Sequence, residues 1–188
     1  MFEHPHDLIH SRICNGLAIR DWPRYLAQAF AALKPGGWVE AQEVSVEVCD
    51  DGNTLPPNSM IVRWHEEVSR AFIASGADLR ISGEVLRGQM RDAGFVNVMV
   101  HEYRWPMGPW HEDPRLKEAG AFAAMSMMAD MESISLAGMT RYGGWEAEEI
   151  KVFLGKVRQE WKTKGLRTYW PLFVVYGQKP EERRRDDE

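Results

Sequence analysis

Hydrophobic residues along the chain recur at two alternating spacings, one typical of helices and one of strands. Between Trp22 and Leu33 they return every three or four positions, which indicates one apolar face of an α-helix. Asp21 supplies an N-cap for this helix, and Pro23 fits its first turn. A Pro-Gly-Gly turn at 35–37 ends it, and the valine-rich run from Trp38 to Val48 predicts a strand.

The same patterns predict the remaining elements. A short strand at 7–11 precedes the first helix, and turn-forming residues predict a loop at 49–59. The segments that follow are helices at 61–74 and 83–93, a strand at 95–105, and helices at 114–139 and 146–162. We expect Val85, Leu86 and Met90 to face inward. A last strand should start only after Pro171, because proline cannot donate to a ladder. The order of elements, β-α-β-α-α-β-α-α-β, predicts an α/β fold.

Length and charge narrow the classes of protein that fit. A chain of 188 residues with 44% hydrophobic residues predicts one domain at 1–179, followed by a charged, disordered tail at 180–188. The net charge of −5 and the lack of a basic stripe exclude typical nucleic-acid binders. We find no apolar run long enough for a membrane span and no signal-peptide pattern, and we expect an intracellular, cytoplasmic protein.

Several motifs, in order, carry a family resemblance. They are "DLIHSR", "DWPRYLAQAFAALKPGGWVEAQE", "LRGQMRDAGFVNV", "GGWEAEEIKVFLGKVRQEW" and "YWPLFVVYGQKP". Together they resemble the fungal LaeA-like methyltransferases, class I enzymes that depend on S-adenosylmethionine (SAM) and are common in secondary-metabolite gene clusters. The resemblance implies a Rossmann-like sheet, SAM as cofactor and a small-molecule secondary metabolite as substrate.

One part of the family pattern is absent from this sequence. In the family, the glycine-rich turn and the acidic residue that grip the cofactor precede the segment resembling "DLIHSR", but only six residues precede Asp7 here, and no GxGxG occurs. The resemblance therefore implies an N-terminally truncated chain that holds strands 4-5-7-6 of the class I sheet with flanking helices. Such a chain should bind SAM poorly or not at all. It also leaves the strand at 7–11 as an open edge for a homodimer or a partner chain.

Two groups of polar residues follow the first two strands, at the edge where ligands bind in open α/β sheets. By the resemblance, His10, Ser11 and Arg12 contact the methionine end of the cofactor; capping of the strand end is the alternative. Glu43 is a candidate to orient a substrate hydroxyl or accept its proton. The alternative is a carboxylate that faces solvent as its strand emerges.

An aromatic and methionine-rich region supplies the remaining candidates. His111 lies beside Trp105 and Trp110 in sequence and is a candidate base, with a solvated loop histidine as the alternative. Trp105, Trp110, Met127 and Met131 are predicted to line a substrate pocket, and core packing is the alternative for the methionines. His65 lies beside an apolar stripe and is interpreted as a boundary residue. His4, His6 and His10 have a metal-like spacing without a matching cluster, so we predict no metal site.

Two functions remain open. The first is transfer of a methyl group from SAM to a small-molecule intermediate, promoted by holding the reacting atoms in line. The second is a truncated, non-methylating relative that acts as a cyclase, isomerase or accessory subunit, or that is inactive. Cofactor binding separates the two.

Overall fold

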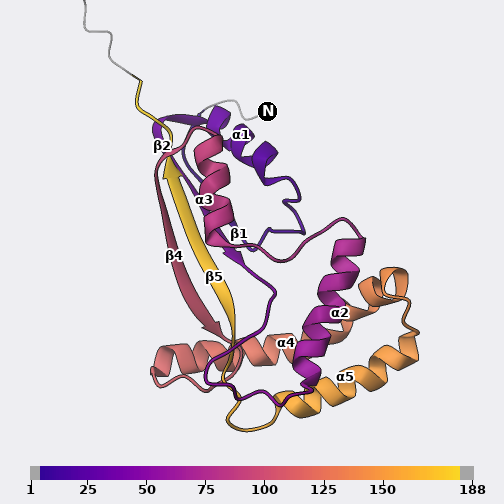
Figure 1. Cartoon of the computed structure of the whole chain (residues 1–188). Helices are drawn as coiled ribbons and strands as arrows, with labels where there is room; N and C mark the ends of the chain where they lie inside the picture. The colour runs from indigo at the N-terminus through magenta and orange to yellow at the C-terminus, as the bar shows by residue number, and fades with distance from the viewer. Residues whose placement is uncertain (1–4, 183–188) are drawn as a thin grey trace, which may run out of the picture. The chain divides into compact units, whose positions relative to one another are not determined.

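The computed structural model describes residues 5–182 (Figure 1). The chain divides into two units. The sheet unit comprises the described residues up to Val44, then Ile81–Glu102, and the described residues from Leu172 onward. The helical unit comprises Ser45–Arg80 and Tyr103–Pro171. The prediction of a single domain at 1–179 stays a prediction, and most of the predicted tail, 183–188, lies outside the described residues.

The sheet unit has the strand order that the resemblance implies. β1 (His6–Arg12) pairs in parallel with β2 (Leu33–Val44), and β2 pairs antiparallel with β5 (Thr168–Gln178). β4 (Val96–Pro106) pairs with β5, and Figure 1 shows the two strands side by side. The order β1-β2-β5-β4 corresponds to strands 4-5-7-6 of a class I methyltransferase sheet. The α/β prediction is therefore confirmed.

Two helices bury their apolar faces against this sheet. α1 (Trp22–Ala32) begins at Asp21, whose side chain accepts a hydrogen bond from the backbone of Arg24, as predicted. α3 (Gly83–Asp92) contributes Leu86 and Met90, both fully buried, to a core that also includes Leu26, Val39 and Val175. Val85 is 53% exposed, so its predicted inward position is wrong. It lies one residue, or about 100° of helix rotation, from Leu86.

Two strand boundaries differ from the prediction because of Pro171. The backbone N–H of Ser45 donates to the Pro171 carbonyl at 3.0 Å, but Pro171 has no N–H to donate in return. The ladder with β2 therefore stops at Val44, four residues before the predicted end. β5 nevertheless starts at Thr168, ahead of the proline, because β3 (Cys49–Asp50) pairs with this first part of the strand.

The helical unit packs α2 (Met60–Ala74), α4 (Pro114–Tyr142) and α5 (Ala147–Trp161) on one another. All three were predicted within a few residues. Their shared core includes the fully buried side chains of Met131, Met139 and Leu154. Trp64 is also buried, and its indole N–H donates to the Ser135 hydroxyl at 2.8 Å. Among the helices of residues 5–182, none has the length and hydropathy to span a membrane.

Candidate functional site

Glu43, near the end of β2, holds the backbone of the loop that follows β1. Its Oε2 accepts hydrogen bonds from the backbone N–H groups of Cys14 at 2.9 Å and Asn15 at 3.0 Å. The side chain is fully buried, so the alternative of a solvent-facing carboxylate is wrong. Because β1 and β2 are parallel, Glu43 joins their carboxyl ends and orders the loop there.

The second oxygen of the same carboxylate is free to accept a hydrogen bond. Glu43 Oε1 has no hydrogen-bond partner among the described residues. Burial raises the pKa of Glu43, while the two backbone N–H groups and the charge of His10 lower it in part. A buried acceptor without a donor is rare in proteins, so a water or a ligand is expected to supply one.

The three predicted cofactor contacts, His10, Ser11 and Arg12, do not lie on the same face of the sheet. In the parallel register Ser11 lies opposite Ala41, on the core face that also carries Glu43, and it is 7% exposed. His10 lies on the other face, where its Nδ1 is 3.0 Å from Glu40 Oε1. Arg12, which is exposed, shares that face with His10. Only Ser11 therefore lies on the face of Glu43, and the contact of all three with a cofactor stays a prediction.

The helical unit contains an apolar cavity of about 660 Å³. This volume is typical of small-molecule sites. Its walls come from the segment after β4, from one face of α4 and from the loop between α5 and β5. The side chains include Met107, Trp110, Ala121, Ala124, Met125, Met128, Trp161, Lys162, Lys164 and Arg167.

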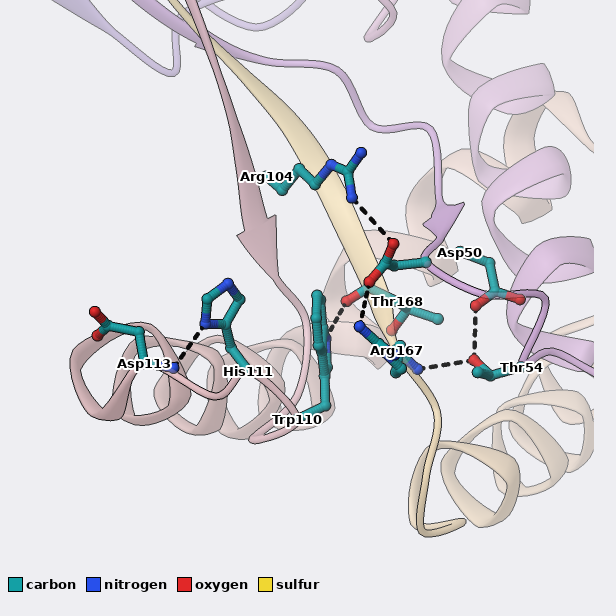
Figure 2. A network of polar contacts seen from close by, with 9 residues as sticks. Asp50, Thr54, Arg104, Trp110, His111, Asp113, Arg167 and Thr168 are labelled. Carbon is teal, nitrogen blue, oxygen red and sulfur yellow. Dashed lines mark hydrogen bonds and ion pairs between the residues drawn. The ribbon is translucent and has the colours of Figure 1, made fainter.

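A polar network fixes the aromatic wall of this cavity (Figure 2). The indole N–H of Trp110 donates to the Thr168 carbonyl at 2.8 Å, and the Arg167 guanidinium lies 5.3 Å from the centre of the Trp110 ring. Arg167 also donates to Asp51 at 2.5 Å, and Arg104 donates to the same carboxylate at 3.0 Å. Trp110 therefore offers the cavity a ring whose polar atom already has a partner.

The four predicted pocket residues have different surroundings. Trp110 lines the cavity, whereas Met131 is fully buried in the helical core. Trp105 packs edge-on against Trp170, with ring centres 6.3 Å apart, and Met127 is half-buried. The α4 methionines in the cavity wall are Met125 and Met128, which sequence reasoning did not select, and Met107 joins them from the segment after β4. The spacing of the two α4 methionines from Ala121 and Ala124, at three or four residues, is the signal that groups them on one face.

His111, the candidate base, has one ring nitrogen engaged. The backbone N–H of Asp113 donates to its Nδ1 at 3.0 Å (Figure 2). This assigns the neutral ring a proton on Nε2, so its outward nitrogen is a donor rather than a base. Its ring centre lies 5.4 Å from that of Trp110. A catalytic role for His111 stays a prediction.

His65 is a core residue, and its interpretation as a boundary residue is wrong. It is 3% exposed and packs against Trp64 and Trp170. Its Nδ1 lies 2.8 Å from the Ile61 carbonyl, and its Nε2 accepts from the Trp170 indole at 2.9 Å. Burial lowers its pKa to about 4, so the ring is neutral with both nitrogens engaged. Sequence position alone did not reveal Trp64, Trp161 and Trp170, whose rings surround it.

Metal ligands do not gather in the part of the chain that the structure describes. Over residues 5–182, no group of three or more histidine, cysteine, aspartate or glutamate side chains could hold a metal ion. His4, one of the three histidines with metal-like spacing, lies outside the described residues.

The comparisons with known proteins point to fungal methyltransferases. No protein-family model matches the sequence. The "Probable methyltransferase tdiE" of Emericella nidulans is 38% identical over 85% of this chain and 50% of its own length. The "Methyltransferase pytC" of Aspergillus terreus is 35% identical over 94% and 54%. The "Secondary metabolism regulator LAE1" of Cochliobolus heterostrophus is 27% identical over 94% and 57%.

A solved structure with some likeness is mycolic acid cyclopropane synthase CmaA1, bound to S-adenosylhomocysteine, with a TM-score of 0.48 and 13% identity. It covers 95% of this chain and 57% of its own chain, and likeness at this level assigns no function. The chain spans about half the length of the curated relatives it matches. By its sequence, the chain is similar to fungal methyltransferases and to fungal regulators of secondary metabolism.

Proposed function

We propose that this chain forms the substrate-side part of a SAM-dependent methyltransferase that modifies a small-molecule intermediate of secondary metabolism. The observation that carries the proposal is the identity with tdiE and pytC across most of the chain. The strand order β1-β2-β5-β4 supports it, because this is the substrate-side half of the sheet implied by the family. A cavity of suitable volume in the helical unit supports it further.

The residues of this chain would act by positioning. When bound, SAM supplies an electrophilic methyl group. Ser11 and Glu43 fit one polar end of such a ligand, since Oε1 of Glu43 is a buried acceptor that lacks a donor. Glu43 also orders the loop after β1 through Cys14 and Asn15. The apolar cavity would hold the acceptor molecule and exclude water from it.

We further propose that another polypeptide covers the outer edge of β1. This strand pairs with β2 and has no second neighbour among the described strands. Leu8 on it is 59% exposed, and Ile13 directly after it is 44% exposed. A bare edge with apolar side chains favours pairing with another chain. In a preparation of the pure chain, a second copy is the available partner.

Cofactor titration tests the function. In calorimetry, the 188-residue chain alone should bind SAM no more tightly than the millimolar range. A protein in which a glycine-rich half is also present, joined or as a partner chain, should bind in the micromolar range and transfer labelled methyl groups. No heat at millimolar SAM with that half present would refute the proposal and leave the non-methylating alternatives.

Ultracentrifugation tests the covered edge. The wild-type chain should sediment as a dimer at micromolar concentration, and Leu8→Lys should shift it toward monomer by placing a charge at the edge. Val152→Lys is a matched control, because Val152 is 64% exposed on α5 in the helical unit. A wild-type chain that is folded and strictly monomeric would contradict this part of the proposal.

A further inference from the structure

The mouth of the cavity in the helical unit carries unpaired positive charge. Lys162 and Lys164 line it, and neither forms an ion pair with any residue in the described part of the chain. Arg167 lines it too and forms an ion pair with Asp51 at 2.5 Å, a carboxylate that it shares with Arg104. None of the described lining residues is acidic. This is a local excess of positive charge on a chain whose net charge is −5.

The lysines lie on a turn with a defined backbone. The N–H groups of Lys162 and Thr163 donate to the carbonyls of Gln159 and Glu160 in the last turn of α5, at 3.3 and 2.8 Å. Gly165 then adopts a φ of +90°, which only glycine accommodates without strain, and the chain turns toward β5. The backbone that carries the two lysines is therefore defined by the end of α5 and by the turn at Gly165.

The rest of the wall is apolar and has its polar atoms satisfied. The indole N–H of Trp161 donates to the Met107 carbonyl at 2.9 Å, and that of Trp110 donates to Thr168. Met125 and Met128 add polarisable, adaptable surface from α4. A ligand would therefore meet aromatic and thioether surface inside the cavity, and the charged wall residues without an ion-pair partner among the described residues are Lys162 and Lys164.

We propose that this cavity binds an aromatic or polyunsaturated carboxylic acid, with its apolar body against Trp110 and the methionines and its carboxylate at Lys162 and Lys164. As the substrate class of the methyltransferase, this inference rests on the proposed function; the binding of the acid does not. The lysines also suit the carbonyl end of α5, so a test must separate binding from helix stability.

A matched pair of fluorescent probes separates an effect on ligand binding from an effect on helix stability. 8-Anilinonaphthalene-1-sulfonate carries the anion, and N-phenyl-1-naphthylamine has the same ring system without it. In the full chain, Lys162→Gln combined with Lys164→Gln should weaken binding of the anionic probe about tenfold and leave the neutral probe within about twofold. Higher salt should likewise weaken only the anionic probe. Lys117→Gln, on α4 and outside the cavity wall, should change neither.

A second variant locates the site. Ala121 is half-buried in the cavity wall, and Ala121→Phe should weaken both probes by filling the space. Thermal unfolding of each variant would establish that it is folded. The inference is overturned if the double lysine variant binds the anionic probe as tightly as wild type, or loses both probes equally.

Displacement of the anionic probe then separates this inference from the function. An aromatic acid such as 2-naphthoic acid should displace the probe at least about fivefold more effectively than its methyl ester. Preference for the acid in a protein that binds no SAM even with a glycine-rich half present would uphold the inference and refute the methyltransferase function. Methyl transfer without any preference for acids would uphold the function and refute the inference.

Discussion

Acid should destabilise the helical unit through His65. Its Nε2 accepts a hydrogen bond from Trp170, and its Nδ1 bonds the Ile61 carbonyl. A second proton would have to enter at Nε2, so it would break the bond to Trp170 and place a charge among tryptophans. Burial accordingly lowers the pKa of His65 from 6.5 to about 4, although the bond to Ile61 raises it in part.

The size and direction of the effect follow from these two pKa values. Since the pKa in the folded chain lies below that in the unfolded chain, the unfolded chain takes up the proton first as the pH falls. The free energy of unfolding is unaffected near pH 7 and decreases as the pH drops below 6.5. The decrease reaches about 2 kcal/mol at pH 5 and about 3 kcal/mol at pH 4. Below the folded-state pKa it no longer grows.

Urea unfolding, followed by tryptophan fluorescence at pH 7, 6 and 5, measures this loss. His65→Gln keeps an oxygen that can accept from Trp170 but does not titrate in this range. Wild type should therefore lose about 2 kcal/mol more than this variant between pH 7 and pH 5. His111→Gln, in the loop before α4, should retain the wild-type dependence. Equal pH dependence for wild type and His65→Gln would refute the reasoning.

Other substitutions test the loop anchor and the close packing of α4. Glu43→Ala leaves the N–H groups of Cys14 and Asn15 without an acceptor and opens a buried space, so chemical unfolding should register a loss of about 2 to 4 kcal/mol. Glu43→Gln keeps one acceptor and should lose less than half of that. Gly120→Ala would place a methyl group 2.1 Å from a backbone oxygen and should lower the melting temperature by several degrees. Gly155→Ala, on α5 with open space around it, should instead add about 0.5 to 1 kcal/mol; a loss there would contradict this account.

The sequence predicted the elements well because their signals are local. The Asp21 cap and the apolar face of α1 each act within a few residues. Pro171 shows where local reasoning fails. A proline is excluded from a strand only where a neighbouring strand offers a carbonyl to the N–H that proline lacks. At Pro171 the neighbour of β5 changes from β2 to β3. The pairing of strands that are distant in sequence determines where β5 begins, so the proline rule alone could not predict its start.

The site was harder to predict, because α4 carries methionines on more than one of its faces. Met127 and Met131 were as plausible from sequence as Met125 and Met128. Which face meets the cavity depends on how α4 packs, and Met131 instead fills the core. Tertiary packing likewise turned Glu43 from an apparent surface carboxylate into a buried anchor. Residue type suggested these side chains, whereas only the fold decides their roles.

The surroundings of the two candidate bases, Glu43 and His111, and of the buried His65 bear on the chemistry. Glu43 is buried and bonded to two backbone N–H groups, His65 has a pKa near 4, and His111 Nδ1 accepts from the backbone. Neither histidine offers a readily protonated lone pair to a ligand in the cavity, and Glu43, whose Oε1 lacks a donor, belongs to the sheet unit rather than to the unit that contains the cavity. If methyl transfer occurs, an acceptor that is already deprotonated at neutral pH would need no base, and positioning alone would serve it. A carboxylate held at Lys162 and Lys164 is such an acceptor, so the charge at the cavity mouth and the engaged state of the two histidines favour the same class of ligand.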